Sequence, residues 1–233
     1  MHKWFHVFWV ALLIPLVSQA APIKYKEGQH YRELRYPVQT SVGKEQVEVS
    51  EVFWYGCPHC FSLEPIVNRW KPSLAKDVKF VRVPGFFSDN IWQDHAKLYH
   101  TIEVLYPDEK KMQEVHDAIF PEIQNRNNRL NTVGSVAEFL NRRFGADKKE
   151  VTKIYNSPGV TGLLSQSFSK SRGYQVTGVP AIVVDGRYVI DAKVGLNNMP
   201  VIADFLVQKV RDDRGALAKE KNSKKDSDQG NKQ

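Results

Sequence analysis

Cysteine is scarce in this sequence, since only two occur among 233 residues. A small secreted protein that depends on several disulfides is therefore excluded, and a chain of this length buries enough apolar surface to fold without them. The excess of positive over negative charge is also small. The formal net charge is +7, which is too low to indicate nucleic-acid binding. After the first twenty residues, no apolar run is long enough to cross a bilayer.

The first twenty residues have the parts of a secretory signal peptide. Lys3 gives a basic start, residues 4–17 are an apolar run, and Ser18-Gln19-Ala20 offers the small residues of a cleavage site. The run is shorter than the roughly 20 apolar residues that span a membrane. We therefore expect residues 1–20 to be removed, with a retained anchor as the alternative. The mature protein is then expected in an oxidising compartment.

The chain that follows begins with a strand, a helix and a strand. β-Branched and aromatic residues over 47–55 predict a buried strand, and the apolar spacing from Pro58 to Leu74 predicts a helix. Residues 78–83 predict a second strand. Because a helix connects them, the two strands are expected to be parallel with a right-handed crossover.

The middle of the chain is helical in pattern, and the end returns to strands. Residues 88–173 carry only helical signals. Asp185-Gly186 then predicts a tight hairpin between two short strands. A last helix is expected from about Asn198 to Arg211, and the charged residues after it are expected to be disordered. The fold class is therefore α/β.

The residues with chemical potential are Cys57-Pro58-His59-Cys60, at the junction of the first strand and its helix. Free backbone N–H groups and the helix dipole at this position stabilise an anion, so the Cys57 thiol is expected to be unusually acidic. His59 adds hydrogen bonding and, when protonated, charge. Cys60, half a turn inward, is expected to resolve the intermediate that Cys57 forms.

Three other uses of two cysteines compete with a redox pair. A structural disulfide would close a loop of only four residues, worth roughly 2 kcal/mol in chain entropy. A zinc site would need two more ligands, and His95, His100 and His116 do not form a closely spaced pair. Haem attachment requires a histidine directly after Cys60, where Phe61 stands. A redox pair without a metal is therefore the prediction.

Two segments resemble the signatures of the DsbA family of periplasmic thiol:disulfide oxidoreductases. They are residues 53–60 (FWYGCPHC) and Thr177-Gly178-Val179-Pro180. The resemblance implies a thioredoxin fold with a helical domain inserted between its βαβ and ββα halves. The implied boundaries are a signal peptide at 1–20, thioredoxin-like parts at 21–84 and 176–213, an inserted helical domain at 85–175, and a disordered charged tail at 214–233.

The resemblance also implies roles for individual residues. Cys57 is the nucleophile, with Pro58 and His59 beside it in the motif, and Cys60 is its buried partner. Val179-Pro180 is a cis-proline loop that lies against the cysteines and binds the substrate backbone.

Glu51 corresponds to a buried acidic residue of the family. The resemblance implies that its carboxyl group moves a proton to or from the buried Cys60 thiol. A carboxylate inside an apolar strand is expected to have a raised pKa, although a structural ion pair is the alternative. Glu64 and Arg82 correspond to an acidic and a basic residue near the site. Arginine replaces the family's lysine at position 82, which puts any proton-shuttle role of that position in doubt.

The function that the resemblance implies is that of a dithiol oxidase. It would donate the Cys57–Cys60 disulfide to newly exported polypeptides with reduced cysteines, without a cofactor. It would act as a monomer in the periplasm and be re-oxidised by a DsbB-like, quinone-linked membrane oxidase.

Two alternatives compete with an oxidase. One is an isomerase or reductase, but the 36 residues between signal and Cys57 leave no room for the dimerisation domain of such isomerases. The other is a peptide-binding chaperone with an aromatic surface made of Trp54, Tyr55, Phe86, Phe87 and Trp92. Aromatic residues are more often part of the core.

Overall fold

A five-stranded sheet forms the centre of the computed structural model, which describes residues 25–86 and 90–230, with side chains as far as residue 218. The strands lie in the order β1-β5-β4-β2-β3. β2 and β3 are parallel, and the other neighbours are antiparallel. The strands are β1 (Arg32–Glu33), β2 (Val47–Phe53), β3 (Val78–Pro84), β4 (Ala181–Val184) and β5 (Tyr188–Asp191). The predicted signal peptide lies outside the described residues.

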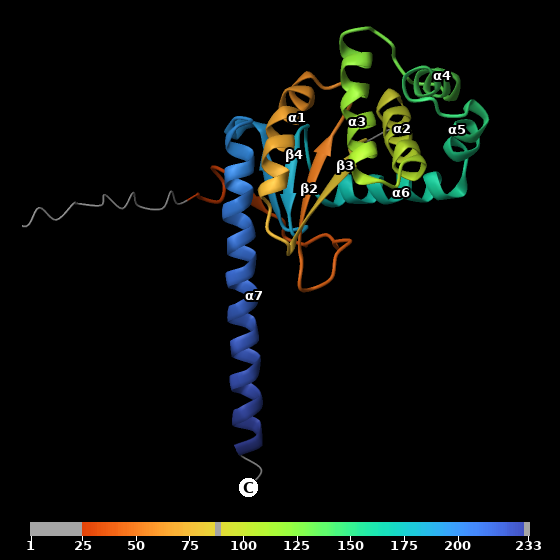
Figure 1. The fold of residues 1–233 in the computed structure, drawn as a ribbon. Helices are drawn as coiled ribbons and strands as arrows, with labels where there is room; N and C mark the ends of the chain where they lie inside the picture. Colours follow the sequence, from red (N-terminus) through yellow and green to blue (C-terminus); the bar gives the residue numbers. More distant parts are fainter. Residues whose placement is uncertain (1–24, 87–89, 231–233) are drawn as a thin grey trace, which may run out of the picture.

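Helices cover the sheet and extend to one side of it (Figure 1). α1 and α7 lie along one face, whereas α2 to α5 form a group beside the sheet that α6 connects back to it. The helices are α1 (Pro58–Trp70), α2 (Ile91–Leu105), α3 (Glu109–Gln124), α4 (Val133–Phe144), α5 (Lys148–Tyr155), α6 (Pro158–Gly173) and α7 (Asn198–Gly230), with short 3-10 turns at Lys71–Ser73 and Ala192–Val194. The strand–helix–strand unit, the helical middle and the final hairpin were all predicted.

The two faces of the sheet bury different side chains, as the period of two in a strand requires. In β4, Ile182 and Val184 pack with residues of α1 and α7. Ala181 and Val183 point to the opposite face and pack with Tyr174, just after α6. Both faces of β2 and β4 are fully buried. The uninterrupted apolar run of β4 is therefore typical of a central strand.

The predicted hairpin connects β4 and β5. Asp185 and Gly186 both have positive φ, at 56° and 62°, the conformation that a tight two-residue turn between strands demands. A Cβ atom on Gly186 would lie 2.0 Å from the Val38 carbonyl oxygen. Only glycine fits there, because the segment before β2 crosses directly over the turn.

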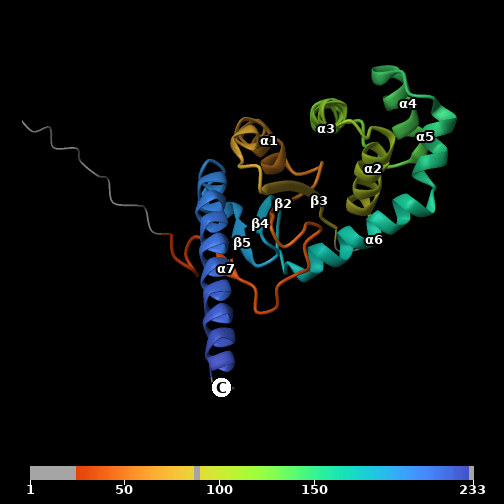
Figure 2. The same cartoon turned by 60° about the horizontal axis from the view of Figure 1, so that its bottom comes forward.

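The prediction for the tail differs from the structure. Residues from 214 onward were expected to be disordered, but α7 continues to Gly230 and extends beyond the sheet (Figure 2). Arg214 donates to the carbonyls of Lys44 and Gln46 and pairs with Asp185 at 2.7 Å. The segment also contains good helix formers and no proline. High charge was therefore a poor guide to its local structure.

Candidate active site

Cys57 lies at the turn that joins β2 to α1. Its N–H donates to the Trp54 carbonyl at 2.9 Å, and Cys57 itself is the N-cap of α1. Pro58 follows in the first turn, where its missing N–H removes no helical hydrogen bond. This turn begins after Phe53, which is why β2 ends two residues before Tyr55, the expected end.

The two cysteines differ in what surrounds them. They are free thiols in the structure, and Cys57 keeps 8% of its surface exposed whereas Cys60 keeps none. The Cys60 N–H donates to the Cys57 sulfur at 3.4 Å. Pro58 and His59 are exposed. A sulfur atom from another molecule can therefore approach Cys57 but not Cys60.

The pKa values of the two thiols move in opposite directions. A hydrogen bond from the Cys60 thiol, helped by the backbone N–H groups of Cys60 and His59 and by the charge of His59, lowers the pKa of Cys57 to about 6, although burial opposes this. Burial and the neighbouring Cys57 raise the pKa of Cys60 far above its ordinary value. One thiol is therefore an anion at neutral pH, and the other holds its proton.

A loop distant in sequence lies against the Cys57 sulfur. The Val179–Pro180 peptide bond is cis, as expected. The Cys57 sulfur lies 3.4 Å from the Val179 carbonyl oxygen, to which it donates when protonated, across 122 positions in the chain. The two segments meet because β4, which begins directly after Pro180, pairs with β2, with Ala181 opposite Val52. The sheet thus carries the loop to the cysteines.

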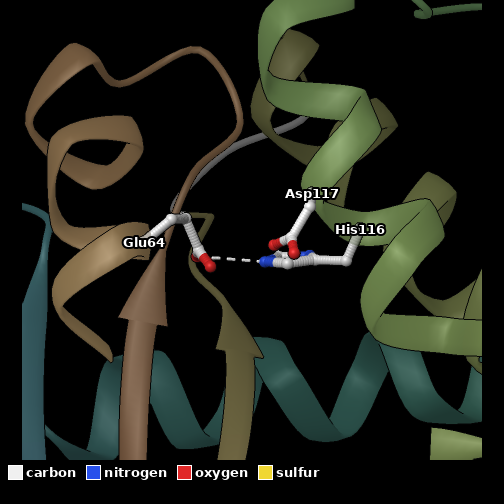
Figure 3. Close-up of side chains that lie close together, drawn as sticks. All are labelled: Glu64, His116 and Asp117. Atoms are coloured by element: carbon white, nitrogen blue, oxygen red, sulfur yellow. Dashed lines mark hydrogen bonds and ion pairs between the residues drawn. The ribbon is translucent and has the colours of Figure 1, made fainter. Parts of the chain in front are cut away.

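Behind Cys60 lies a buried cluster of charged side chains. Arg82 stands opposite Glu51 in the parallel register of β2 and β3. Its Nε lies 3.2 Å from Glu51 Oε2, and its terminal nitrogen donates to Glu64 Oε2 at 2.9 Å. Glu64 Oε1 contacts His116 Nε2 at 3.0 Å, as Figure 3 shows, and His116 Nδ1 contacts the Tyr55 hydroxyl at 2.8 Å. The cluster joins β2, β3, α1 and α3.

The two glutamates of the cluster are not equivalent. Burial and the nearby charge of Glu64 raise the pKa of Glu51 to about 8, despite the attraction of Arg82. Although burial opposes it, His116 and Arg82 lower the pKa of Glu64. The Glu51–Arg82 contact lacks the direction of a hydrogen bond, and neither Glu51 oxygen has a hydrogen-bond partner among the described residues. Glu51 therefore keeps its proton at neutral pH, whereas Glu64 is the charged partner of Arg82.

Glu64, His116 and Asp117 are also the described residues closest to a metal-binding arrangement, with one ligand atom from each within 4.8 Å of the others. Their side chains lie together in Figure 3. His116 Nε2 is, however, already bonded to Glu64, and Asp117 accepts hydrogen bonds from Asn68 and Gln113. The guanidinium of Arg82 on Glu64 would also repel a cation. The cluster is therefore better described as a hydrogen-bonded ion network.

The other two histidines that could have served as zinc ligands bind different partners. His95 Nε2 contacts the Arg129 carbonyl at 2.8 Å, and the two nitrogens of His100 contact Glu103 and Ser167. Neither reaches the cysteines, so they form no zinc site with them.

A family model and two curated relatives all match this chain to the same protein family. A family model described as a DSBA-like thioredoxin domain matches residues 82–207. The thiol:disulfide interchange protein DsbA of Pseudomonas aeruginosa is 37% identical over 205 residues, which cover 87% of this chain and 92% of the relative. The DsbA of Azotobacter vinelandii is also 37% identical, and the match covers 85% of this chain and 92% of the relative. The chain belongs to the DsbA family. It is therefore a thiol:disulfide oxidoreductase.

Solved DsbA structures have the same fold. The crystal structure of Pseudomonas aeruginosa DsbA matches with a TM-score of 0.75 and 38% identity, over 84% of this chain and 97% of the other. A DsbA structure from Xylella fastidiosa matches with a TM-score of 0.73 and 26% identity, over 80% and 98% of the two chains. The thioredoxin fold with inserted helices is therefore confirmed.

Gln124 is a contributor to this DsbA-family site that the sequence did not reveal. It ends α3, and its Nε2 donates to the carbonyls of Tyr55 and Cys57 at 2.8 and 3.0 Å. It thereby ties the helical group to the active-site turn. His116 stood out in the sequence only as a possible zinc ligand, yet it supports Glu64. No local pattern marks either residue, because both act across more than fifty positions of sequence.

The aromatic residues near the motif are mostly part of the core. Tyr55 and Phe86 are buried, and Trp54 stacks on Trp92 with ring centroids 4.2 Å apart. Phe87 lies outside the described residues. These contacts argue against an exposed aromatic surface of the kind that a chaperone needs. In the part of the chain that the structure describes, no helix is long and apolar enough to cross a membrane.

The first prediction concerns the Cys57 thiol. Thiolate absorbance of the reduced protein, followed against pH, should show a midpoint at about 6. The variant His59→Ser should raise this midpoint, because it removes a positive charge near the sulfur. The variant His30→Ser, which changes a histidine whose ring accepts a hydrogen bond from the Lys26 N–H and contacts Tyr25, should leave it unchanged. A midpoint at or above about 7, the value of thioredoxin, would contradict the assignment.

The second prediction concerns Glu51. The folded protein holds this proton up to about pH 8, whereas the unfolded chain releases it near the ordinary pKa, so the native state binds more protons in between. Wild-type stability should therefore fall as pH rises through this window, by up to about 3 kcal/mol at pH 7. Because glutamine carries no such proton, Glu51→Gln should gain stability relative to wild type as pH rises from about 4.5 to 8, measured by urea unfolding.

Glu48 provides the matched control, since it is a second fully buried glutamate of β2. Burial alone would raise its pKa, but hydrogen bonds from Lys170 and Ser41 lower it. Its stabilisation is present above the unfolded pKa and is lost as pH falls through the folded pKa. Glu48→Gln should therefore be less stable than wild type at neutral pH, with the difference shrinking in acid. If the stability of both variants relative to wild type changed with pH in the same way, the assignment of a protonated Glu51 and an ionised Glu48 would be refuted.

Proposed function

We propose that this DsbA-family protein is a periplasmic dithiol oxidase, which transfers the Cys57–Cys60 disulfide to exported polypeptides. The observation that carries the proposal is the contrast between the two thiols. Cys57, at the N-terminus of α1, has a pKa lowered to about 6, whereas the pKa of buried Cys60 is strongly raised. When the Cys57–Cys60 disulfide of such a site is reduced, Cys57 leaves the bond as a stabilised thiolate.

The direction of the reaction follows from this stabilised thiolate. At pH 7, a thiol with a pKa of about 6 is about nine-tenths ionised, whereas an ordinary thiol is almost fully protonated. The reduced form is therefore stabilised by about 1.4 kcal/mol, or about 30 mV for a two-electron couple. This effect increases as pH rises from 6 towards the ordinary thiol pKa. Everything that stabilises the Cys57 anion makes the disulfide a stronger oxidant.

The proposed reaction has two exchange steps. A client thiolate attacks the Cys57 sulfur, the Cys57–Cys60 bond breaks, and Cys60 leaves with the electron pair. A second client thiolate then attacks the client sulfur of this mixed disulfide and releases Cys57 as a thiolate. The client loses two electrons and gains a disulfide, and the enzyme is left as a dithiol. No cofactor is needed, because the cysteine pair carries both electrons.

Glu51 is the proposed proton donor to Cys60 when that sulfur leaves. A buried thiolate with a strongly raised pKa is a poor leaving group unless it is protonated. Glu51 holds a proton at neutral pH, and it lies close enough for its charge to raise the pKa of the Cys60 thiol. Its carboxyl has no hydrogen-bond partner among the described residues, which favours a proton carrier over a purely structural ion pair. Arg82 remains positively charged and would hold Glu51 in place.

The cis-proline loop is the proposed client-binding element. The Val179 carbonyl lies beside the Cys57 sulfur, and Pro180 is buried while Val179 is partly exposed. An extended client segment could pair with the backbone of Val179, in the manner of a strand added to a sheet edge. The client cysteine would then lie next to Cys57.

The proposed setting is the periplasm, where the protein acts as a monomer on exported polypeptides with reduced cysteines. The basic and apolar pattern of residues 1–20 supports export, as does membership of the DsbA family. A DsbB-like, quinone-linked membrane oxidase is the proposed source of re-oxidation, since each turnover leaves the enzyme reduced. A stabilised Cys57 thiolate disfavours a reductase role, because it makes the reduced enzyme more stable relative to its disulfide form.

The third prediction separates the roles of the two cysteines. With oxidised glutathione, Cys60→Ser should form a mixed disulfide at Cys57 and retain it, since no second thiol resolves it. Cys57→Ser should form almost none at neutral pH, because Cys60 is buried and protonated. Intact-mass measurement detects the adduct, and similar adduct rates in the two variants would overturn the assignment. Cys57→Ser should also lose insulin reduction. A chaperone that works without its thiols would keep its activity in this variant.

A further inference from the structure

A pocket of about 440 Å³ lies where the C-terminal ends of α3 and α4 meet, outside the cysteine site. It is lined by Glu122, Arg126, Asn128, Arg142 and Arg143. Three cationic side chains therefore face one carboxylate. Because the lining carries excess positive charge, the pocket suits an anion.

The buried carboxylate of Glu122 holds the side chains that line this pocket. Its side chain is 3% exposed, and its two oxygens accept hydrogen bonds from Arg126 at 3.1 Å and from Arg142 at 2.8 Å, with Asn128 adding a third at 3.0 Å. Burial opposes ionisation, but these partners lower the pKa of Glu122. The carboxylate is therefore charged and holds both guanidinium groups in place.

The two arginines retain donors for a ligand. Their side chains are 57% and 54% exposed, and each uses a single terminal nitrogen for Glu122, although a guanidinium has five N–H donors. Arg143 is exposed and has no side-chain partner among the described residues. Planar guanidinium donors in this arrangement match a carboxylate, which can accept two hydrogen bonds from one fork.

The pocket lies at the active-site end of the molecule. Gln124, in the last turn of α3, donates to the Cys57 carbonyl, whereas Glu122, two residues earlier and on another face of that turn, is bonded to Arg142 of α4. In Figure 1 the C-terminal end of α3 and the start of α1 lie at the same end of the fold. An extended polypeptide advances about 3.3 Å per residue. A client segment that leaves Cys57 and passes the C-terminal end of α3 would therefore reach the arginines.

We propose that this pocket binds an acidic side chain of the client polypeptide, a few residues from the cysteine that reacts with Cys57. The proposal rests on the oxidase function proposed above and adds a preference among its clients. The charge balance of the lining selects an aspartate or glutamate, and the exposure of the arginines limits the preference to a modest one. Exposed ion pairs of this kind change equilibria by about 1.5-fold to five-fold each.

The test uses two synthetic peptides, each with two reduced cysteines. They differ only in carrying either two glutamates or two glutamines four residues from the reacting cysteine. At low salt, the oxidised wild-type protein should oxidise the acidic peptide about three- to ten-fold faster than the neutral one, and added salt should reduce this ratio. Equal rates would overturn the proposal. If neither peptide is oxidised, the proposed oxidase function fails instead.

The variants separate the pocket from general electrostatic attraction. Arg142→Gln with Arg143→Gln removes two charges but leaves Glu122 bonded to Arg126 and Asn128. It should bring the ratio of rates close to one without changing the rate for the neutral peptide. The matched control is Lys149→Gln with Lys153→Gln, which removes equal charge from exposed positions of α5.

The control should keep the wild-type ratio. A ratio that survives in the arginine variant, or that falls equally in the lysine control, would contradict the proposal. If the double arginine variant is poorly folded, Arg143→Gln alone decides the matter, since that side chain contacts no partner among the described residues. It should lower the ratio measurably, and an unchanged ratio would overturn the proposal.

Discussion

The Cys57 sulfur is stabilised as an anion by its position at the start of α1, and the rest of the site is arranged around that charge. The Cys60 N–H points at the sulfur, while Gln124 holds the turn that presents it. β4 brings the Val179 carbonyl to the same atom. If this turn moved, the thiolate would lose its donors and the loop would lose its position beside Cys57. The sheet therefore matters chiefly because the pairing of β4 with β2 places the Val179-Pro180 loop beside the Cys57 turn.

Burial of charge is the second constraint, and β2 meets it in two ways. Glu48 is surrounded by donors from Lys170, Ser41 and Ser50, so it is stable as a carboxylate. Glu51, three positions later, shares Arg82 with Glu64 and has no hydrogen-bond partner among the described residues. The same residue type in the same strand is thus ionised in one place and neutral in the other. Such an unsatisfied group is costly, which is consistent with a role beyond folding.

Much of the fold could be predicted because its signals are local. The β-branched run before Cys57, the proline after it and the Asp185-Gly186 turn each reflect the conformation of a few neighbouring residues. The order of strand, motif and apolar helical spacing was also enough to predict that Cys57 stands at a helix start. The resemblance, rather than any pattern, indicated Glu51 and the Val179-Pro180 loop.

Other features could not be predicted because they depend on distant parts of the chain. Gln124 and His116 reach the site from α3, and nothing near them in sequence differs from an ordinary amphipathic helix. The two-residue strand β1 is too short to carry a pattern. The charge of residues 214–233 predicted disorder, whereas α7 continues to Gly230. The segment also has high helix propensity, and the contacts of Arg214 with the body of the protein have no local signal.

The Cys57 thiolate is stabilised by its surroundings, and this stabilisation should make the Cys57–Cys60 disulfide more oxidising than one formed by two ordinary thiols. Equilibration of the protein with mixtures of reduced and oxidised glutathione measures this most directly. We expect a reduction potential above that of thioredoxin, about −270 mV, with about 30 mV of the difference supplied by the lowered pKa of Cys57; membership of the DsbA family, whose value is about −120 mV, favours a larger total difference. We also expect His59→Ser to lower the potential. A potential close to that of thioredoxin, or one that His59→Ser leaves unchanged, would contradict the central role of the thiolate.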